Sequence, residues 1–220
     1  MLSLLESAKY ISVLHTFSPV VSITSTGRSL VLPLIQLVKP KTKLSAQKKS
    51  GDKGEETTAR RLQKVPVPGH SRILRNVILK SSLGKMLAEI DILLVSEYGI
   101  FVIENKEIAG VIRGGMTEEN WMRLWYGSGK TAVLPLVNPI LQNRKHVSRL
   151  ANELHMAAKR YFYSIAVFPE RAVLKVKGNG KSREFVVTRE KIAATILDVV
   201  RNGEKVLSAD EVDEIVLGLM

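Results

Sequence analysis

The sequence predicts an α/β fold in which a central mixed sheet begins as an antiparallel meander and is flanked by helices. Three apolar runs with strand-like alternation follow one another between turn signals, at 73–79, 86–95 and 100–106. Helical patterns precede and follow these runs. With 220 residues, 45% of them hydrophobic, the chain can bury one good core. We therefore expect one domain of catalytic size.

The chain is strongly basic, with a formal net charge of +12 and a pI near 9.9. This charge favours nucleic acid as a partner, because Lys and Arg side chains that neutralise phosphates release counterions. Charge that serves only solubility is the alternative. Cysteine is absent, which excludes disulfides, thiolate catalysis and cysteine-based zinc sites.

Residues 1–39 are predicted to form an N-terminal apolar extension. Residues such as Pro19, Gly27 and Pro33 interrupt its apolar clusters, so none approaches the roughly 20 apolar residues that span a bilayer. A clean signal peptide is also missing, and we expect a cytoplasmic protein. The sequence leaves open whether this extension packs on the domain, contacts a partner or touches a membrane surface. It also leaves the oligomeric state open.

A basic linker at 40–53 and a helix from Gly54 to Lys64 are expected next. The linker is rich in lysine and poor in apolar residues, and it could also lie along a phosphate backbone. The helix would turn Ala59 and Leu62 inward. Glu55 lies in its first turn, where the helix dipole favours a carboxylate whatever its function.

Two acids and a lysine interrupt the apolar strands of the predicted hairpin 86–106. Asp91 lies inside the first strand, whereas Glu104 and Lys106 share one face of the second. Two buried carboxylates that face each other repel, so they require a cation or a shared proton. Carboxylate oxygens select a hard cation, which indicates Mg²⁺ or Mn²⁺ rather than zinc.

The register of this hairpin follows from its turn. If Val95 opposes Ile100, antiparallel pairing puts Asp91 opposite Glu104. The same register puts Glu89 opposite Lys106. A turn at 81–85 connects the first strand of the meander to this hairpin.

A further strand is predicted at 110–115 and another around Trp121 and Trp125. Exposed tryptophans can stack on bases, but such residues more often belong to a core. The glycine-rich segment 127–131 invites comparison with a phosphate-binding loop. A Walker motif would need glycine where Leu124 stands, so we expect a hairpin turn.

A helix is predicted to start at Asn138 and Pro139 and to continue to Leu154. Asparagine accepts from the first free backbone N–H groups, and proline at the first helical position loses no hydrogen bond. Gln142 lies in the opening turn, close to N–H groups suited to an anion, although an exposed glutamine is often inert. Basic side chains continue along this helix: Arg144, Lys145, His146 and Arg149.

The rest of the chain is expected to complete the same sheet and cover it. Thr188 and Ser208 are plausible helix caps. No histidine is assigned to a metal, because none has the helical spacing of a ligand pair. The expected elements are strands at 162–168, 172–176 and 184–187, a turn at 178–180, and helices at 189–201 and up to Leu219.

Taken in order, these motifs resemble the nuclease-related domain (NERD) of the PD-(D/E)XK nuclease superfamily. The Asp…Glu-x-Lys pattern alone is common, but the ordered set is more specific. It comprises Gly54-Glu55-Glu56, Glu89-Ile90-Asp91, Gly99 to Lys106, Gly110 with Ile112 and Gly114, Trp121, and Asn138-Pro139-Ile140-Leu141-Gln142-Asn143. The resemblance covers roughly Gly54 to Leu154. It implies a restriction-endonuclease-like core at 54–160, with 161–220 completing the same domain.

The resemblance also implies the members of a metal site. Asp91 and Glu104 would bind Mg²⁺ or Mn²⁺, with the backbone carbonyl of Asn105 as a further ligand. Glu55 would be an extra ligand or would lie just behind the ligands. The family more often carries threonine or an apolar residue where Asn105 stands, and this side chain is expected to point away from the site.

The remaining catalytic roles fall to Lys106 and Gln142. Lys106 would orient or deprotonate the attacking water, or stabilise developing negative charge. The amide of Gln142 would orient the scissile phosphate or a water, as the resemblance implies. The expected function is a metal-dependent nuclease that hydrolyses phosphodiester bonds, with DNA as the expected substrate.

Two other classes of function are alternatives. One is a catalytically silent module with a nuclease-like fold that binds nucleic acid or acts in signalling; the intact set of acids and lysine argues against it. The other is a carbohydrate hydrolase with two carboxylates, in which Lys106 would have no clear task.

Overall fold

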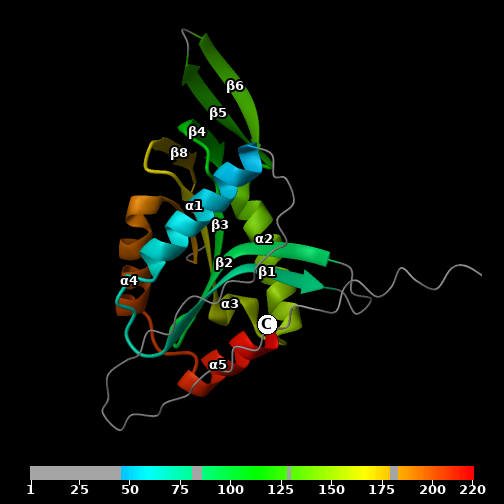
Figure 1. The fold of residues 1–220 in the computed structure, drawn as a ribbon, viewed down its shortest axis with the longest axis vertical. Helices are drawn as coiled ribbons and strands as arrows, with labels where there is room; N and C mark the ends of the chain where they lie inside the picture. Colours follow the sequence, from blue (N-terminus) through cyan, green and yellow to red (C-terminus); the bar gives the residue numbers. More distant parts are fainter. Residues whose placement is uncertain (1–45, 81–85, 128–129, 179–182) are drawn as a thin grey trace, which may run out of the picture.

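The computed structural model describes residues 46–80, 86–127, 130–178 and 183–220. Five strands form a central sheet and four form a second, smaller sheet (Figure 1). In chain order the elements are α1 (Ala46–Leu62), β1 (Ser71–Lys80), β2 (Met86–Ser96), β3 (Gly99–Asn105), β4 (Gly110–Gly115), β5 (Asn120–Gly127), β6 (Lys130–Val137), α2 (Pro139–Glu153), α3 (Ala158–Tyr161), β7 (Phe162–Phe168), β8 (Ala172–Lys177), β9 (Glu184–Thr188), a 3-10 turn η1 (Arg189–Lys191), α4 (Ile192–Asn202) and α5 (Ala209–Gly218).

The central sheet has the strand order β1-β2-β3-β7-β9. Its first three strands are antiparallel, whereas β7 runs parallel to β3 and β9 runs parallel to β7. The sheet is therefore mixed and begins with an antiparallel meander, which confirms the predicted fold class.

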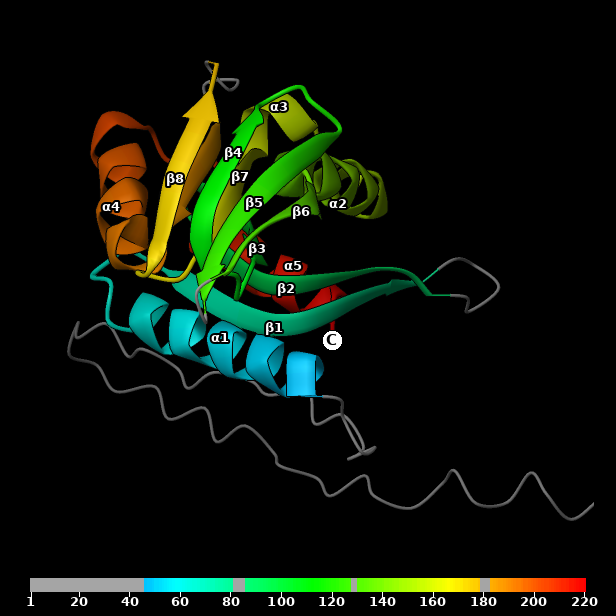
Figure 2. The same cartoon turned by 90° about the horizontal axis from the view of Figure 1, so that it is seen from above.

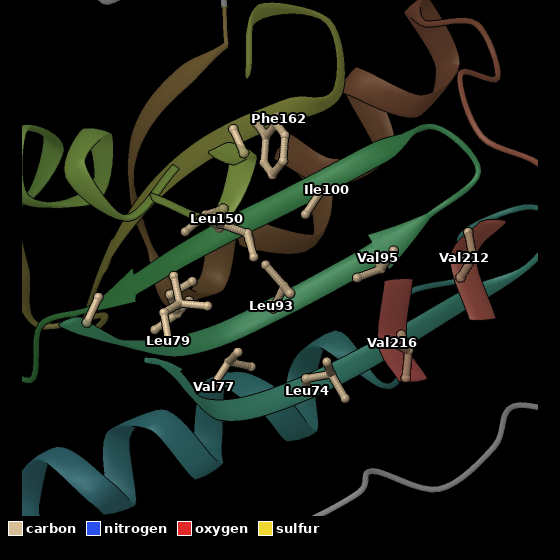
Figure 3. Packing of buried hydrophobic residues seen from close by; sticks show 14 of the residues in the cluster. Leu74, Val77, Leu79, Leu93, Val95, Ile100, Leu150, Phe162, Val212 and Val216 are labelled. Atoms are coloured by element: carbon tan, nitrogen blue, oxygen red, sulfur yellow. The ribbon is translucent and has the colours of Figure 1, made fainter. Parts of the chain in front are cut away.

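Helices cover both faces of the central sheet. On one face α2 and α5 bury Leu150, Val212 and Val216 against the apolar side chains of β1 to β3 (Figure 3). On the other face α1 and α4 pack through a second cluster that includes Ala59 and Ile196. Because both faces are buried, β3 is apolar along nearly its whole length, as strands covered on two sides usually are.

The second sheet has the order β6-β5-β4-β8. Its inner face packs on the end of the central sheet through Ile112, Trp121 and Phe168. The segment at 172–176 was expected in the central sheet, and this prediction is wrong. As β8 it runs parallel to β4, a pairing between segments far apart in the sequence that local patterns do not encode.

Two helix starts differ from the prediction. Helix α1 begins at Ala46, so the last part of the predicted linker at 40–53 is helical. The segment after Thr188 begins with a 3-10 turn, and the Thr188 hydroxyl bonds to Glu190 instead of capping the helix. The side chain of Arg189 in this turn is buried and donates to the hydroxyl of Thr58 and to Glu170. By contrast, Ser208 caps α5 with a complete capping box.

Several predictions lie outside the described residues. These are the extension at 1–39, the first part of the linker, the turn at 81–85 and most of the turn at 178–180. Within the described part of the chain, no helix is long and apolar enough to cross a membrane.

Asn138 joins the second sheet to α2. Its side-chain oxygen accepts from the backbone N–H of Ile140 at 2.8 Å, which confirms the predicted cap. Its amide group donates to the carbonyl of Glu118 at 2.6 Å and lies 3.3 Å from that of Gly115. The residue is fully buried. One side chain therefore fixes both the start of the helix and the turn between β4 and β5.

Replacing Asn138 with alanine should lower the free energy of unfolding by about 2–3 kcal/mol, because a helix cap is lost and the carbonyl of Glu118 loses the Asn138 donor. Urea denaturation would measure this change. The exposed cap variant Ser208→Ala should cost only about 1 kcal/mol. Equal costs at the two caps would contradict the role assigned to the Asn138 amide group.

Candidate active site

The candidate site lies where β3 leaves β2. The predicted pairing of Val95 with Ile100 is confirmed, and the ladder ends at Ile92 and Ile103. Beyond this point β3 stays with β7, and the backbone N–H of Lys106 donates to the carbonyl of Val167 at 2.8 Å. Asp91 and Glu104 therefore lie at the end of the ladder. The predicted pairing of Glu89 with Lys106 is not part of it.

Asp91 occupies the gap that opens between the two strands. Its carboxylate accepts a hydrogen bond from the backbone N–H of Asn105 at 2.8 Å. Burial, followed by the charges of Glu104 and Glu55, raises the pKa of Asp91 to about 8. Glu55 acts on Asp91 from α1, on the opposite side of β3 from α2. The structure thus brings the three predicted acids into one electrostatic cluster.

Glu104 and Lys106 form the centre of the site. The Glu104 side chain is only 4% exposed, and its Oε1 atom lies 2.7 Å from Nζ of Lys106. The same Nζ atom donates to Oε1 of Gln142 at 3.0 Å. Lys106 therefore joins the end of β3 to the first turn of α2, and it stays 19% exposed. The predicted association of Glu104, Lys106 and Gln142 is present in the structure.

Helix α2 adds two residues that the sequence analysis did not assign to the site. His146 follows Gln142 by one helical turn, and its Nδ1 atom lies 3.5 Å from Oε2 of Glu104. Burial lowers the pKa of His146, while the charge of Glu104 opposes this shift. Asn143 donates to the carbonyl of Val102 at 2.7 Å and so holds α2 against β3. The four-residue spacing of Gln142 and His146 was the signal that could have identified His146.

The opposite side of β3 is held by a buried polar network. The side chain of Asn105 points away from Glu104, as expected, and accepts a hydrogen bond from the hydroxyl of Thr58 on α1 at 2.7 Å. Arg189 donates from Nε to the same hydroxyl at 2.9 Å and forms an ion pair with Glu107. Thr58 is three residues beyond Glu55 on α1. The network therefore fixes the helix that carries Glu55 against the residue that supplies a backbone N–H to Asp91.

Two features of the acids suit a cation. Oε2 of Glu104 is buried and has no hydrogen-bond partner, and the pKa of Asp91 is raised in part by the neighbouring negative charges. Asp91 and Glu104, with Glu55 nearby, are the side chains that could hold a hard metal ion. Within the residues that the structure describes, no group of three or more His, Asp or Glu side chains is already arranged as a metal site. Backbone oxygens or water would have to complete the coordination.

The two tryptophans of β5 differ in environment. Trp121 is buried and packs near Phe168, with ring centroids 6.4 Å apart, so its predicted place in the core is confirmed. Trp125 is 38% exposed and lies toward the tip of the β5–β6 hairpin, outside the core. Gly127 pairs with Lys130, so β5 and β6 form the expected hairpin, and residues 128–129 of its turn lie outside the described residues.

One comparison with known proteins gave a match. The family model for the nuclease-related domain, NERD, matches residues 50–169. No curated protein and no solved structure gave a match. The matched region contains most of α1, the first three strands, the second-sheet strands β4 to β6, helix α2 and β7, and with them every residue of the cluster around Glu104. The chain belongs to the nuclease-related domain family.

Proposed function

We propose that this protein is a metal-dependent nuclease that hydrolyses phosphodiester bonds, with DNA as its substrate. The observation that carries the proposal is the position of Lys106, whose Nζ atom touches both Glu104 and Gln142 beside Asp91. A basic donor between a buried acid and the first turn of a helix suits a phosphate group. The formal charge of +12 supports a polyanionic substrate.

Asp91 and Glu104 would hold Mg²⁺ or Mn²⁺, with the carbonyl of Asn105 and the carboxylate of Glu55 as further ligands. The bound ion would supply neutralisation of the phosphate charge. Glu104 is already paired with Lys106 through one oxygen, so its buried second oxygen, which has no hydrogen bond and faces His146 at 3.5 Å, would be the atom that binds the ion.

Lys106 and Gln142 would position the reactants. Hydrolysis forms a bond from a water oxygen to phosphorus, breaks one bridging phosphorus–oxygen bond and moves a proton from the water to the departing oxygen. The ammonium group of Lys106 would hold a phosphate oxygen or the water and stabilise developing negative charge. Because Oε1 of Gln142 accepts from Lys106, the NH₂ group of Gln142 is the donor that would bind the phosphate.

A second candidate is a nuclease-like module that binds nucleic acid without turnover. It is favoured by the pairing of Glu104 with Lys106, and by the lack, in the described ranges, of a complete cluster of three metal-binding side chains. The first experiment below separates the two candidates.

Purified parent protein should cleave DNA only when Mg²⁺ or Mn²⁺ is present. Asp91→Ala and Lys106→Ala should each lower the rate by at least about 100-fold, because each removes a group that stabilises charge at the phosphate. The measurement is a cleavage assay on supercoiled, linear and single-stranded DNA and on RNA. The exposed-lysine variant Lys64→Ala should retain the parent rate.

Equal cleavage by all variants would indicate a contaminant or a misplaced site. If the parent does not cleave but shows salt-sensitive DNA binding, the silent binding module is the better description.

Asp91→Asn should change how stability depends on pH in the presence of EDTA. The pKa of Asp91 is raised in the folded state to about 8. The protonated carboxyl therefore contributes fully to the free energy of unfolding below pH 4, and this contribution is lost as the pH rises toward 8. Between pH 5 and pH 8 the parent should lose about 2 kcal/mol more than the variant, after allowance for partial solvation of the carboxyl. Denaturant titrations at both pH values would show this. A variant that loses stability as steeply as the parent would contradict the raised pKa.

Thr58→Val should disturb the site through Asn105 without changing side-chain volume. It removes the hydroxyl that links Asn105 to Arg189, leaving two buried polar groups without that partner, and should cost about 2–3 kcal/mol in the free energy of unfolding. The divalent-ion concentration needed for half-maximal cleavage should also rise, by about fivefold.

Thr58→Ser keeps the hydroxyl and is the matched control. Its divalent-ion concentration for half-maximal cleavage should equal that of the parent, even if the lost methyl group lowers the free energy of unfolding. If valine and serine at this position give the same ion requirement, the network does not position the acids.

A further inference from the structure

The second sheet presents an outer face, directed away from Ile112 and Trp121, that carries aligned apolar side chains. We call this side of β4, β5, β6 and β8 the outer face. Strand register places its residues in rows that cross all four strands. The first row is Val173, Val111, Leu124 and Val133, and the second is Lys175, Arg113, Met122 and Pro135.

The outer face is exposed. Val133 is 60% exposed, Met122 is 51% exposed, and Tyr126, farther along β5 on the same side, is 61% exposed. Among the described residues, α1, α2 and α4 lie beside or behind the second sheet and none lies across this face (Figure 2). The β5–β6 hairpin also projects beyond the helices (Figure 1). Single exposed apolar residues need no explanation, but an apolar row continued by Met122, Pro135 and Tyr126 indicates a binding surface.

The charge of this sheet is of one sign. Its four strands contain no Asp or Glu, and they contain the basic residues Arg113, Arg123, Lys130, Lys175 and Lys177. Arg113, Lys175 and Lys177 are exposed and belong to the outer face. Of the nearby acids, Glu118 accepts from the backbone N–H of Gly115 in the turn before β5. The outer face therefore offers positive charge and apolar surface together.

Two of the chain connections of the second sheet lead directly to the candidate active site. Strand β4 begins at Gly110, shortly after Lys106. Strand β6 ends at Val137 and passes through Asn138 into α2, which carries Gln142. The second sheet is thus joined covalently to the chain segments that hold Lys106 and Gln142.

We propose that the outer face of β4, β5, β6 and β8 binds an unpaired nucleic-acid strand and presents it to the active site. Phosphates would contact Arg113, Lys175 and Lys177, and base faces would lie on the apolar rows and Tyr126. An intact duplex exposes mainly phosphate and sugar along its surface, whereas unpaired bases offer apolar faces to such rows. The inference deepens the proposed nuclease function, on which it rests.

Two other occupants are possible outcomes of the test. An anionic membrane would also suit apolar and basic residues together. A second copy of the chain would bury the apolar rows, but the basic residues on the two copies would then repel. Continuity with a site built for phosphate chemistry favours the nucleic acid.

The test is fluorescence anisotropy with the full chain in EDTA, which separates binding from cleavage. The probes are a labelled oligothymidylate of about 20 nucleotides and a duplex of equal length. The variant Arg113→Gln/Lys175→Gln/Lys177→Gln should bind the single strand at least about tenfold more weakly. The slope of log affinity against log salt should fall in magnitude by about 2, as the loss of three phosphate contacts requires.

Two further variants sharpen the test. Lys64→Gln/Lys191→Gln/Arg201→Gln removes the same charge from exposed positions outside the second sheet, and should change affinity by less than about twofold. Tyr126→Ala/Val133→Thr keeps the charge, and should weaken single-strand binding by about tenfold while leaving duplex binding within about twofold. Circular dichroism and thermal unfolding would verify that each variant is folded.

Equal losses in the two charge variants would overturn the proposal, because the effect would then be that of net charge alone. So would tighter binding of duplex than of single strand, with no effect of Tyr126→Ala/Val133→Thr. Binding to phosphatidylserine vesicles without binding to the oligonucleotide would assign the face to a membrane, and a dimer dissociated by Val133→Thr/Val173→Thr would assign it to a second copy. Single-strand binding that depends on this face in a protein without cleavage activity would support the surface while refuting the nuclease.

Discussion

The separation of β3 from β2 is the constraint on which the site depends. Up to Ile103 the strand has partners on both sides, and beyond it the backbone continues only with β7. The N–H group of Asn105 is therefore available to a side chain, and Asp91 accepts it. Inside a sheet, a backbone N–H group is rarely free to donate to a carboxylate, because it normally bonds to a carbonyl of the neighbouring strand. The end of one ladder thus creates the position in which a second acid can lie beside Glu104.

The resulting cluster is costly to the fold. Glu104 is almost completely buried, and burial together with neighbouring charge favours the neutral form of Asp91. Lys106 pairs with one oxygen of Glu104, whereas the other oxygen has no hydrogen bond and lies 3.5 Å from Nδ1 of His146. Apolar residues would pack here without this penalty, so the acids weaken the fold where chemistry is expected to occur. A cation bound between Asp91 and Glu104 would convert their repulsion into attraction.

The two faces of the central sheet contribute separately to the site. From one face, α2 brings Gln142 and His146 to Glu104, and Asn143 anchors this helix on the carbonyl of Val102. From the other face, α1 brings Glu55, and Thr58 with Arg189 anchors it on Asn105. Apolar packing alone would leave the position of each helix along the sheet weakly defined. Buried polar contacts, which are lost if the register changes, set both helices in place.

Much of this arrangement could be predicted from local sequence. Alternating apolar residues identified every strand of the meander, the turn fixed the pairing of Val95 with Ile100, and Asn138 with Pro139 marked the start of α2. The association of Asp91, Glu104 and Lys106 also followed, because side-chain alternation and hairpin register are properties of neighbouring residues.

The tertiary structure decided the rest. The membership of β8 in a second sheet, the contact of His146 with Glu104 and the link from Arg189 through Thr58 to Asn105 all join segments distant in the chain. Asn105 illustrates the difference, because its backbone N–H donates to Asp91 and its side chain accepts a hydrogen bond from Thr58 on α1. Sequence alone determined that Asp91, Glu104 and Lys106 lie on neighbouring strands of one hairpin, since spacing and alternation encode this. Which groups touch depended on how helices and sheets pack, because that packing is set by the whole core rather than by any single segment.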